Sequence, residues 1–242
     1  MPEKVKAKTG RAGAYIETTR DPFIAALLVF PVYLLYQVGL AITPGIRNGA
    51  DLITDLLIRL KAWQPAVLWG VAAAIIVAYG VALWRLRKKE RFSPALFGLV
   101  ALEGSIHGVL MFFLVNKVMQ AILMGGGGGG DYPFHVDVVL SLGAGFHEEL
   151  VFRVLLFGGM IFIGAKVLKA SSIWLVLGAA VVSSLVFSAV HYVGPLADSF
   201  TLGSFVFRFL AGCYFAAVYR FRGFAVAVYT HAIYDIGIFA LT

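Results

Sequence analysis

The sequence contains little charge and almost no cysteine. Only 14% of its 242 residues are charged, whereas 60% are hydrophobic and the mean hydropathy is +0.88. A soluble domain typically has about 45–50% apolar residues, so this composition indicates an integral membrane protein. The single cysteine, Cys213, excludes an internal disulfide, and its apolar surroundings indicate a packing residue rather than a nucleophile.

Several functional signatures are also missing. The chain has neither a serine-containing nucleophile motif nor HExxH, so serine-type and ordinary zincin mechanisms lack support. It has no internal repeat and no paired Gly- or Pro-broken helices, which argues against a transporter. The formal net charge of +7 comes mostly from basic residues between apolar runs. That distribution is typical of topology determinants, so we expect no nucleic-acid partner.

The apolar runs predict an all-α, polytopic membrane bundle with about seven transmembrane helices. Residues 1–21 form a basic cytoplasmic segment, and residues 22–242 form a single transmembrane domain. Apolar residues at helical spacing within 44–64 predict an amphipathic helix at the membrane surface. Six glycines at 125–130 predict a flexible connector. The expected spans are residues 23–43, 65–84, 94–124, 136–168, 172–192, 202–219 and 224–241.

Lysine and arginine are unevenly divided between the two sides of this arrangement. Most lie in the N-terminal segment, the 85–91 and 166–169 loops and the 220–222 turn. The segments on the other side contain only Arg47, Arg59 and Lys61. The positive-inside rule therefore predicts a multi-pass protein of the inner (plasma) membrane, with its N-terminus cytoplasmic and its C-terminus outside.

The fourth expected span contains a cluster of ionisable residues, which in a membrane usually marks a functional site. Glu149 and Arg153 are four residues apart on one helical face and can pair. Glu148, which follows His147, lies about 100° around the helix and has no such partner. Its carboxylate is therefore available for chemistry. The alternative interpretation is a purely structural cluster that locks helices together.

Two other spans carry polar residues at helical spacing. Phe187 and His191 are four residues apart, as are His231 and Asp235. We expect these residues to converge with Glu148 in one pocket. There Glu148 could act as a general base on water, while donors on another helix stabilise the oxyanion of amide hydrolysis. Two histidines and carboxylates could also hold a metal ion, although we expect neither a metal nor another cofactor.

Together the three motifs resemble those of the CPBP family, the CAAX-protease and bacteriocin-processing family that is also called Abi. The motifs are Glu148-Glu149-x-x-x-Arg153, Phe187-x-x-x-His191 and His231-x-x-x-Asp235. Their order on successive hydrophobic segments is similar too. The resemblance covers about residues 136–242, which would form the catalytic core.

The resemblance implies an intramembrane endopeptidase of the glutamic type, in which Glu148 and His191 activate water. His231 and Asp235 would form the oxyanion side of the site. The supporting residues would be Glu149, Arg153 and Phe187. The family's last motif often ends in asparagine, and an ionised Asp235 cannot donate to an oxyanion. We therefore expect Asp235 to orient His231, which remains the donor.

The expected partners are the lipid bilayer and a substrate peptide, which is the C-terminal or leader segment of a membrane-associated protein. Its identity does not follow from the sequence, because the family's substrates include prenylated tails, leader peptides and sorting tails. One alternative is a non-catalytic bacteriocin-immunity or partner-binding membrane protein that retains the pocket. Another is a proton-coupled transporter. Because His191 lies at the outer end of its span, we expect the pocket to open outward.

Overall fold

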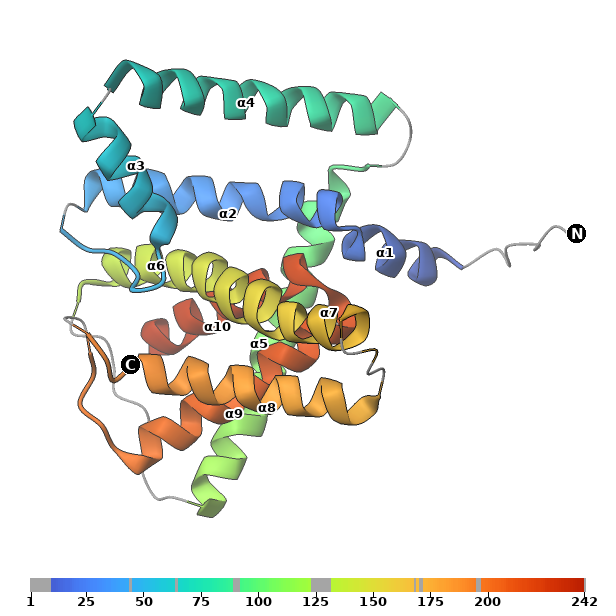
Figure 1. Ribbon diagram of the computed structural model, residues 1–242, viewed down its shortest axis with the longest axis vertical. Helices are drawn as coiled ribbons and strands as arrows, with labels where there is room; N and C mark the ends of the chain where they lie inside the picture. Colours follow the sequence, from blue (N-terminus) through green and yellow to red (C-terminus); the bar gives the residue numbers. More distant parts are fainter. Residues whose placement is uncertain are drawn as a thin grey trace, which may run out of the picture.

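The structure is a computed structural model that describes residues 10–43, 45–63, 65–88, 92–122, 132–167, 169, 172–194 and 197–241. All regular structure in these ranges is helical, which confirms the expected all-α membrane bundle (Figure 1). The elements are α1 (Arg11–Arg20), α2 (Pro22–Ile42), α3 (Leu52–Trp63), α4 (Pro65–Lys88), α5 (Ala95–Ile122), α6 (Phe134–Gly143), η1 (Ala144–Gly158), α7 (Gly159–Lys166), α8 (Ile173–Val190), α9 (Leu202–Arg222) and α10 (Phe224–Leu241). The glycine connector at 125–130 lies outside the described residues.

Four of the described helices are long and apolar enough to cross a bilayer on their own: α2, residues 95–115 of α5, α8 and α9. The last helix, α10, is a shorter apolar helix. The expected total of seven spans stays a prediction. Helix α1 lies within the segment 1–21, for which the sequence indicated only a basic character, and α3 lies within the expected amphipathic region.

The fourth expected span consists of three consecutive segments, α6, η1 and α7, rather than one regular α-helix. The middle segment, η1, is a π-helix of 15 residues, and it carries the ionisable cluster. π-Helical segments are rare, and they occur frequently at functional sites. The unusual winding of the backbone therefore coincides with the residues that the sequence marks as functional.

Side-chain caps determine where three of the spanning helices begin. Asp21 accepts hydrogen bonds from two backbone N–H groups of the first turn of α2, where Pro22 occupies the first helical position. Ser172 caps α8 and Thr201 caps α9 in the same way, each with one backbone N–H group. These caps satisfy donors that a helix end would otherwise leave unpaired.

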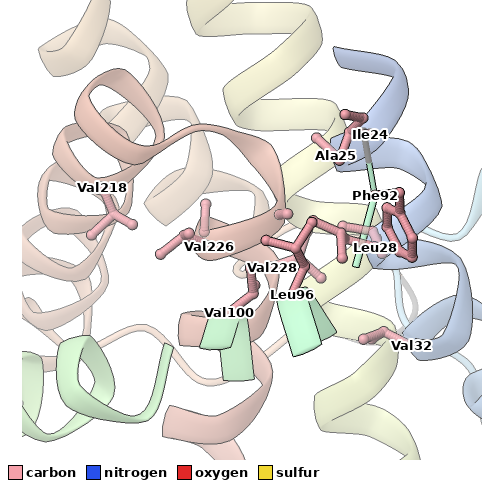
Figure 2. Packing of buried hydrophobic residues seen from close by; sticks show 13 residues of the cluster. Ile24, Ala25, Leu28, Val32, Phe92, Leu96, Val100, Val218, Val226 and Val228 are labelled. Carbon is pink, nitrogen blue, oxygen red and sulfur yellow. The ribbon is translucent and has the colours of Figure 1, made fainter. Parts of the chain in front are cut away.

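Helix α10 lies at the centre of the bundle and packs against α5, η1, α6, α9 and α2. After Phe224, residues 225–228 are all alanine or valine, and they are fully buried. They meet apolar side chains of α2 and α5 in the main hydrophobic core, as Figure 2 shows for Leu28, Val100 and Val228. A helical segment that is apolar on all sides is suited to such a position. This packing places the His231 motif inside the bundle.

Helices η1 and α10 approach each other at Gly145. A Cβ atom at this position would lie 2.8 Å from both the Cβ atom of Ala232 and the carbonyl oxygen of Val228. Such distances are too short for real contacts, and the backbone of α10 cannot move as a flexible side chain can. The glycine therefore allows η1 to lie directly against α10.

We expect Gly145→Ala to destabilise the protein, because an added methyl group forces the two helices apart. Overpacking of this kind typically costs about 1–3 kcal/mol. The matched control is Gly159→Ala, where a Cβ atom meets nothing within 4 Å. Thermal unfolding in detergent should show a lower Tm for the first variant and an unchanged or slightly higher Tm for the control. Equal Tm values would contradict the close approach of η1 and α10.

Candidate active site

Two helical segments direct polar side chains towards Glu148 of η1. His191 follows the last residue of α8, and its Nε2 lies 3.9 Å from Glu148 Oε2. His231 of α10 places its Nε2 at the same distance from the same oxygen. Asp235 lies beside it, with Oδ2 3.4 Å from His231 Nε2. Glu148 is only 8% exposed, so the three motifs meet at a buried carboxylate.

The other nitrogen of each histidine ring has a different partner. His191 Nδ1 lies 2.7 Å from the carbonyl oxygen of Phe187, and His231 Nδ1 lies 2.9 Å from Glu149 Oε1. A carbonyl oxygen and an ionised carboxylate can only accept hydrogen bonds. Both Nδ1 atoms must therefore carry a hydrogen and donate it. Both Nε2 atoms are consequently directed at Glu148. We expected Asp235 to orient His231. In the structure Glu149 contacts Nδ1 of this ring, and Asp235 lies on the Nε2 side.

Glu149 and Arg153 form a fully buried pair. Arg153 Nε lies 3.3 Å from Glu149 Oε2, and both side chains are 0% exposed. The guanidinium carbon also lies 4.7 Å from the ring centroid of Phe187 and 5.6 Å from that of Phe215. Aromatic faces attract a desolvated cation, so the two rings complement the carboxylate. Glu149 thus connects Arg153 on its own helix to His231 on α10.

Two phenylalanines form the apolar walls of the site. Phe187 has its ring centroid 5.0 Å from the His191 ring and 6.2 Å from the His231 ring. Phe215 of α9 stacks on His231 at 4.2 Å with an interplanar angle of 15°. Phe215 did not stand out in the sequence, because it is one of 20 phenylalanines in a mostly apolar chain. The walls keep the polar atoms in a largely desolvated environment.

A loop between α2 and α3 also reaches the site. Asn48 Nδ2 donates a hydrogen bond of 2.7 Å to Glu148 Oε1. The interpretation of Glu148 as a carboxylate without a partner is therefore wrong: its partner comes from a loop rather than from its own helix. No spacing rule relates residues 100 positions apart, so the sequence contained no signal for this contact.

The same loop contains Asp51, whose Oδ1 lies 2.9 Å from His147 Nε2. Burial by itself would raise the pKa of Asp51, but hydrogen bonds from His147, Thr54 and Tyr36 lower this pKa to about 2. Asp51 is consequently ionised at neutral pH. It provides a fixed negative charge next to His147, the residue that precedes Glu148.

The described residues contain no group of three or more His, Cys, Asp or Glu side chains arranged so that they could hold a metal ion. The expectation of a metal-free site stays a prediction, which the activity measurements below can test. The chemistry available from the residues themselves is a carboxylate base, two histidines with distinct Nδ1 partners, and a carboxylate beside one of them.

Comparison with protein-family models gives a match in the C-terminal part of the chain. Residues 132–237 match the model described as type II CAAX prenyl endopeptidase Rce1-like. This segment belongs to the CPBP family. The Rce1-like segment includes all three motifs and indicates, at the family level, an intramembrane endopeptidase of the CAAX type. It does not include α1 to α5 or the loop that carries Asn48. No curated protein and no solved structure matches the chain.

We expect Arg153→Ala to reduce the amount of folded protein strongly, because it leaves Glu149 buried without its cation. Removing one partner of a buried pair typically costs about 3–5 kcal/mol. The control is Arg208→Ala, whose partner Asp198 is half exposed. A pair open to water contributes about 0–1 kcal/mol, and the hydrogen bond from Arg208 to the Tyr192 hydroxyl group adds about 1 kcal/mol. A second control, Glu148→Gln, keeps the shape of the side chain and should leave the amount of folded protein unchanged.

Size-exclusion chromatography of detergent extracts measures folded protein in each variant, and thermal unfolding provides the Tm. A similar loss of folded protein in Arg153→Ala and Glu148→Gln would contradict the assignment of Glu149 as structural and Glu148 as reactive.

Proposed function

We propose that the protein is an intramembrane endopeptidase that cleaves a peptide bond in a membrane-associated peptide or protein tail, with Glu148 as the base. The main support is the position of Glu148 Oε2, 3.9 Å from Nε2 of His191 and of His231. These separations are too long for direct hydrogen bonds but suit groups connected through one water molecule. A base that reaches its proton through such a water meets the geometric requirement for general base catalysis.

In the proposed reaction, Glu148 Oε2 takes a proton from water while the water oxygen adds to the carbonyl carbon of the substrate. The carbonyl π electrons move to the carbonyl oxygen and form a tetrahedral oxyanion. Breaking the C–N bond restores the carbonyl group, and the proton held by Glu148 passes to the leaving nitrogen. No covalent enzyme intermediate is required.

The two histidines have different roles in this proposal. His191 carries its hydrogen on Nδ1, so its Nε2 accepts a hydrogen bond from the water and orients it. His231 has carboxylates near both ring nitrogens, which favour a ring protonated on both. Its Nε2–H then donates to the oxyanion. Glu149 orients this ring through Nδ1, and Asp235 supports the charge from the other side.

The family description supports a specific first class of substrate, a prenylated C-terminal tail of the CAAX type. We propose this class before leader peptides, because the Rce1-like segment includes every residue assigned to the chemistry. A prenyl chain would also hold the tail at the bilayer, where the buried site can reach it.

We expect the wild-type protein in liposomes to cleave a fluorogenic, farnesylated CAAX peptide more efficiently than its unprenylated form. Glu148→Gln should lower kcat about 10²–10⁴-fold, the usual contribution of a general base. The control is Asp137→Asn, the same change of charge at a buried carboxylate on α6 outside the three motifs, which should retain activity. Cleavage that persists in Glu148→Gln would overturn the assignment of the base.

The same assay separates the alternatives. Activity that survives exhaustive chelation supports water activation without a metal, whereas activity lost to a chelator and restored by zinc would contradict it. Wild-type protein that binds the peptide without cleaving any member of a panel of tail and leader peptides would indicate a binding or immunity protein instead.

His191 and the loop that carries Asn48 follow the C-terminal ends of α8 and α2. Figure 1 places the C-terminal ends of α2 and α8 at one end of the bundle and α1 at the other. Helix α1 is held there by Arg20, whose Nη2 donates to the carbonyl oxygen of Arg220. With a cytoplasmic N-terminus, the pocket would therefore open outward.

Single cysteines in a Cys213→Ala background test this direction of access. Val193, close to His191, is 76% exposed, and Phe221, at the α1 end, is 69% exposed. A membrane-impermeant thiol reagent should label Val193→Cys in intact cells and Phe221→Cys only in inside-out vesicles. The opposite pattern would place the pocket on the cytoplasmic side and leave the catalytic assignment unchanged.

A further inference from the structure

The loop between α2 and α3 provides a contact to the proposed base that no motif of the Rce1-like segment contains. Asn48 Nδ2 donates to Glu148 Oε1 at 2.7 Å, and Asn48 lies far outside residues 132–237. We infer that Asn48 is a positioning residue for Glu148, held in place by a buried network of Tyr36, Asp51 and His147. The catalytic part of this inference rests on the proposed function, whereas the contact between Asn48 and Glu148 does not.

The orientation of the Asn48 amide group is determined by its own turn. Its Oδ1 accepts a hydrogen bond of 2.8 Å from the backbone N–H of Ala50. Only an oxygen can accept from this donor, so the NH₂ end of the amide must face Glu148. The backbone N–H of Asn48 donates to the hydroxyl oxygen of Tyr36 at 3.2 Å. The backbone and the side-chain amide of Asn48 are therefore both held by contacts that do not involve Glu148.

The buried network connects this loop to η1 directly before Glu148. The Tyr36 hydroxyl group donates to Asp51 Oδ2 at 2.7 Å, and Asp51 Oδ1 accepts from the backbone N–H of Thr54 at 2.8 Å. Asp51 Oδ1 also lies 2.9 Å from His147 Nε2, while His147 Nδ1 lies 3.1 Å from the carbonyl oxygen of Gly143. The side chains of Tyr36, His147 and Asp51 are all buried. The loop is thereby held at a defined distance from the helix that carries the base.

Helix packing brings Tyr36 to this position. A Cβ atom at Gly143 would lie 2.5 Å from the ring of Tyr36, so the ring rests against the bare backbone of the helix. A residue with a side chain at 143 would displace the ring together with the hydroxyl group that holds the loop. The close approach of α2 therefore determines where Asn48 lies.

The two carboxylate oxygens of Glu148 face different partners. Oε1 accepts from Asn48, and Oε2 faces the two histidines. A carboxylate rotates readily about its last torsion, which has broad, two-fold preferences. A donor on one oxygen removes this freedom and holds the other oxygen in the direction of the water that it must deprotonate.

Asn48 also influences the charge state of the base without adding a charge. An N–H group that donates to a carboxylate stabilises its ionised form. The other charged or titratable groups that face Glu148 are His191 at the end of α8, His231 from α10 and Arg153 from η1 itself. Asp235 lies behind His231. Replacing Asn48 leaves all of these groups in place, so its effect can be measured separately.

The test compares Asn48→Ala with Asn48→Asp in liposomes on the farnesylated CAAX peptide. The aspartate keeps the shape of the side chain and the oxygen that accepts from Ala50, but it loses the donor to Glu148. We expect kcat to fall about tenfold in Asn48→Ala with little change in KM. The acidic limb of the pH profile of kcat/KM should move upward by about one pH unit, and further in Asn48→Asp.

Gln37→Ala is the matched control. Gln37 is a carboxamide on α2 whose Nε2 donates to Thr54 Oγ1 at 2.8 Å, so it holds α3 without contacting Glu148. We expect this variant to lower the Tm and to leave the pH profile unchanged. Equal pH shifts in Gln37→Ala and Asn48→Ala would show that the loop acts only through stability, and would overturn the inference.

An infrared titration tests the contact independently of activity. The C=O band of protonated Glu148 is identified as the band that disappears in Glu148→Gln. We expect this band to appear at a higher pH in Asn48→Ala than in the wild type or in Gln37→Ala. Identical titrations would overturn the inference even if the protein is a peptidase. If the wild type cleaves no peptide, the proposed function fails, and the infrared result still decides the role of Asn48.

Discussion

The arrangement of the site depends on one buried cation. Arg153 is fully buried in an apolar bundle, where an unpaired guanidinium would be strongly unfavourable. Glu149 compensates it through Oε2 and uses Oε1 to bind His231 Nδ1. The carboxylate that neutralises the arginine therefore also sets the angle of the histidine ring on α10. Removing this connection would affect folding and ring orientation together.

The two adjacent glutamates have different surroundings, which supports different roles for them in the proposed mechanism. Both oxygens of Glu149 have partners within the bundle, Arg153 at Oε2 and His231 at Oε1. Glu148 has one oxygen held by a neutral amide and the other directed at two histidines without direct hydrogen bonds. In the proposed mechanism, this second oxygen is where water can be bound and deprotonated. The aromatic walls of Phe187 and Phe215 limit access of bulk solvent, which strengthens electrostatic interactions in the pocket.

Much of this could be predicted from the sequence, because several features depend only on position along a helix. Apolar runs long enough for a bilayer predicted the helical membrane bundle, which α2, α8 and α9 confirm. Four-residue spacing predicted that Glu149 could reach Arg153, and the two lie 3.3 Å apart. The combined motifs predicted the family, which the match over residues 132–237 confirms. The residue types also favoured hydrolysis by a glutamate and a histidine, which stays a prediction.

Only the tertiary structure decided which side chain faces which. Spacing along a helix specifies neighbours on that helix, so it assigned His231 to Asp235 and left Glu148 without a partner. The pairing of His231 with Asp235 is present on Nε2, but packing of η1 against α10 at Gly145 also brought Glu149 to His231 Nδ1. Packing of α2 against Gly143 brought Asn48 to Glu148 across 100 positions of the chain. Contacts of this kind depend on how helices approach one another in three dimensions, a property that no local pattern of residues contains.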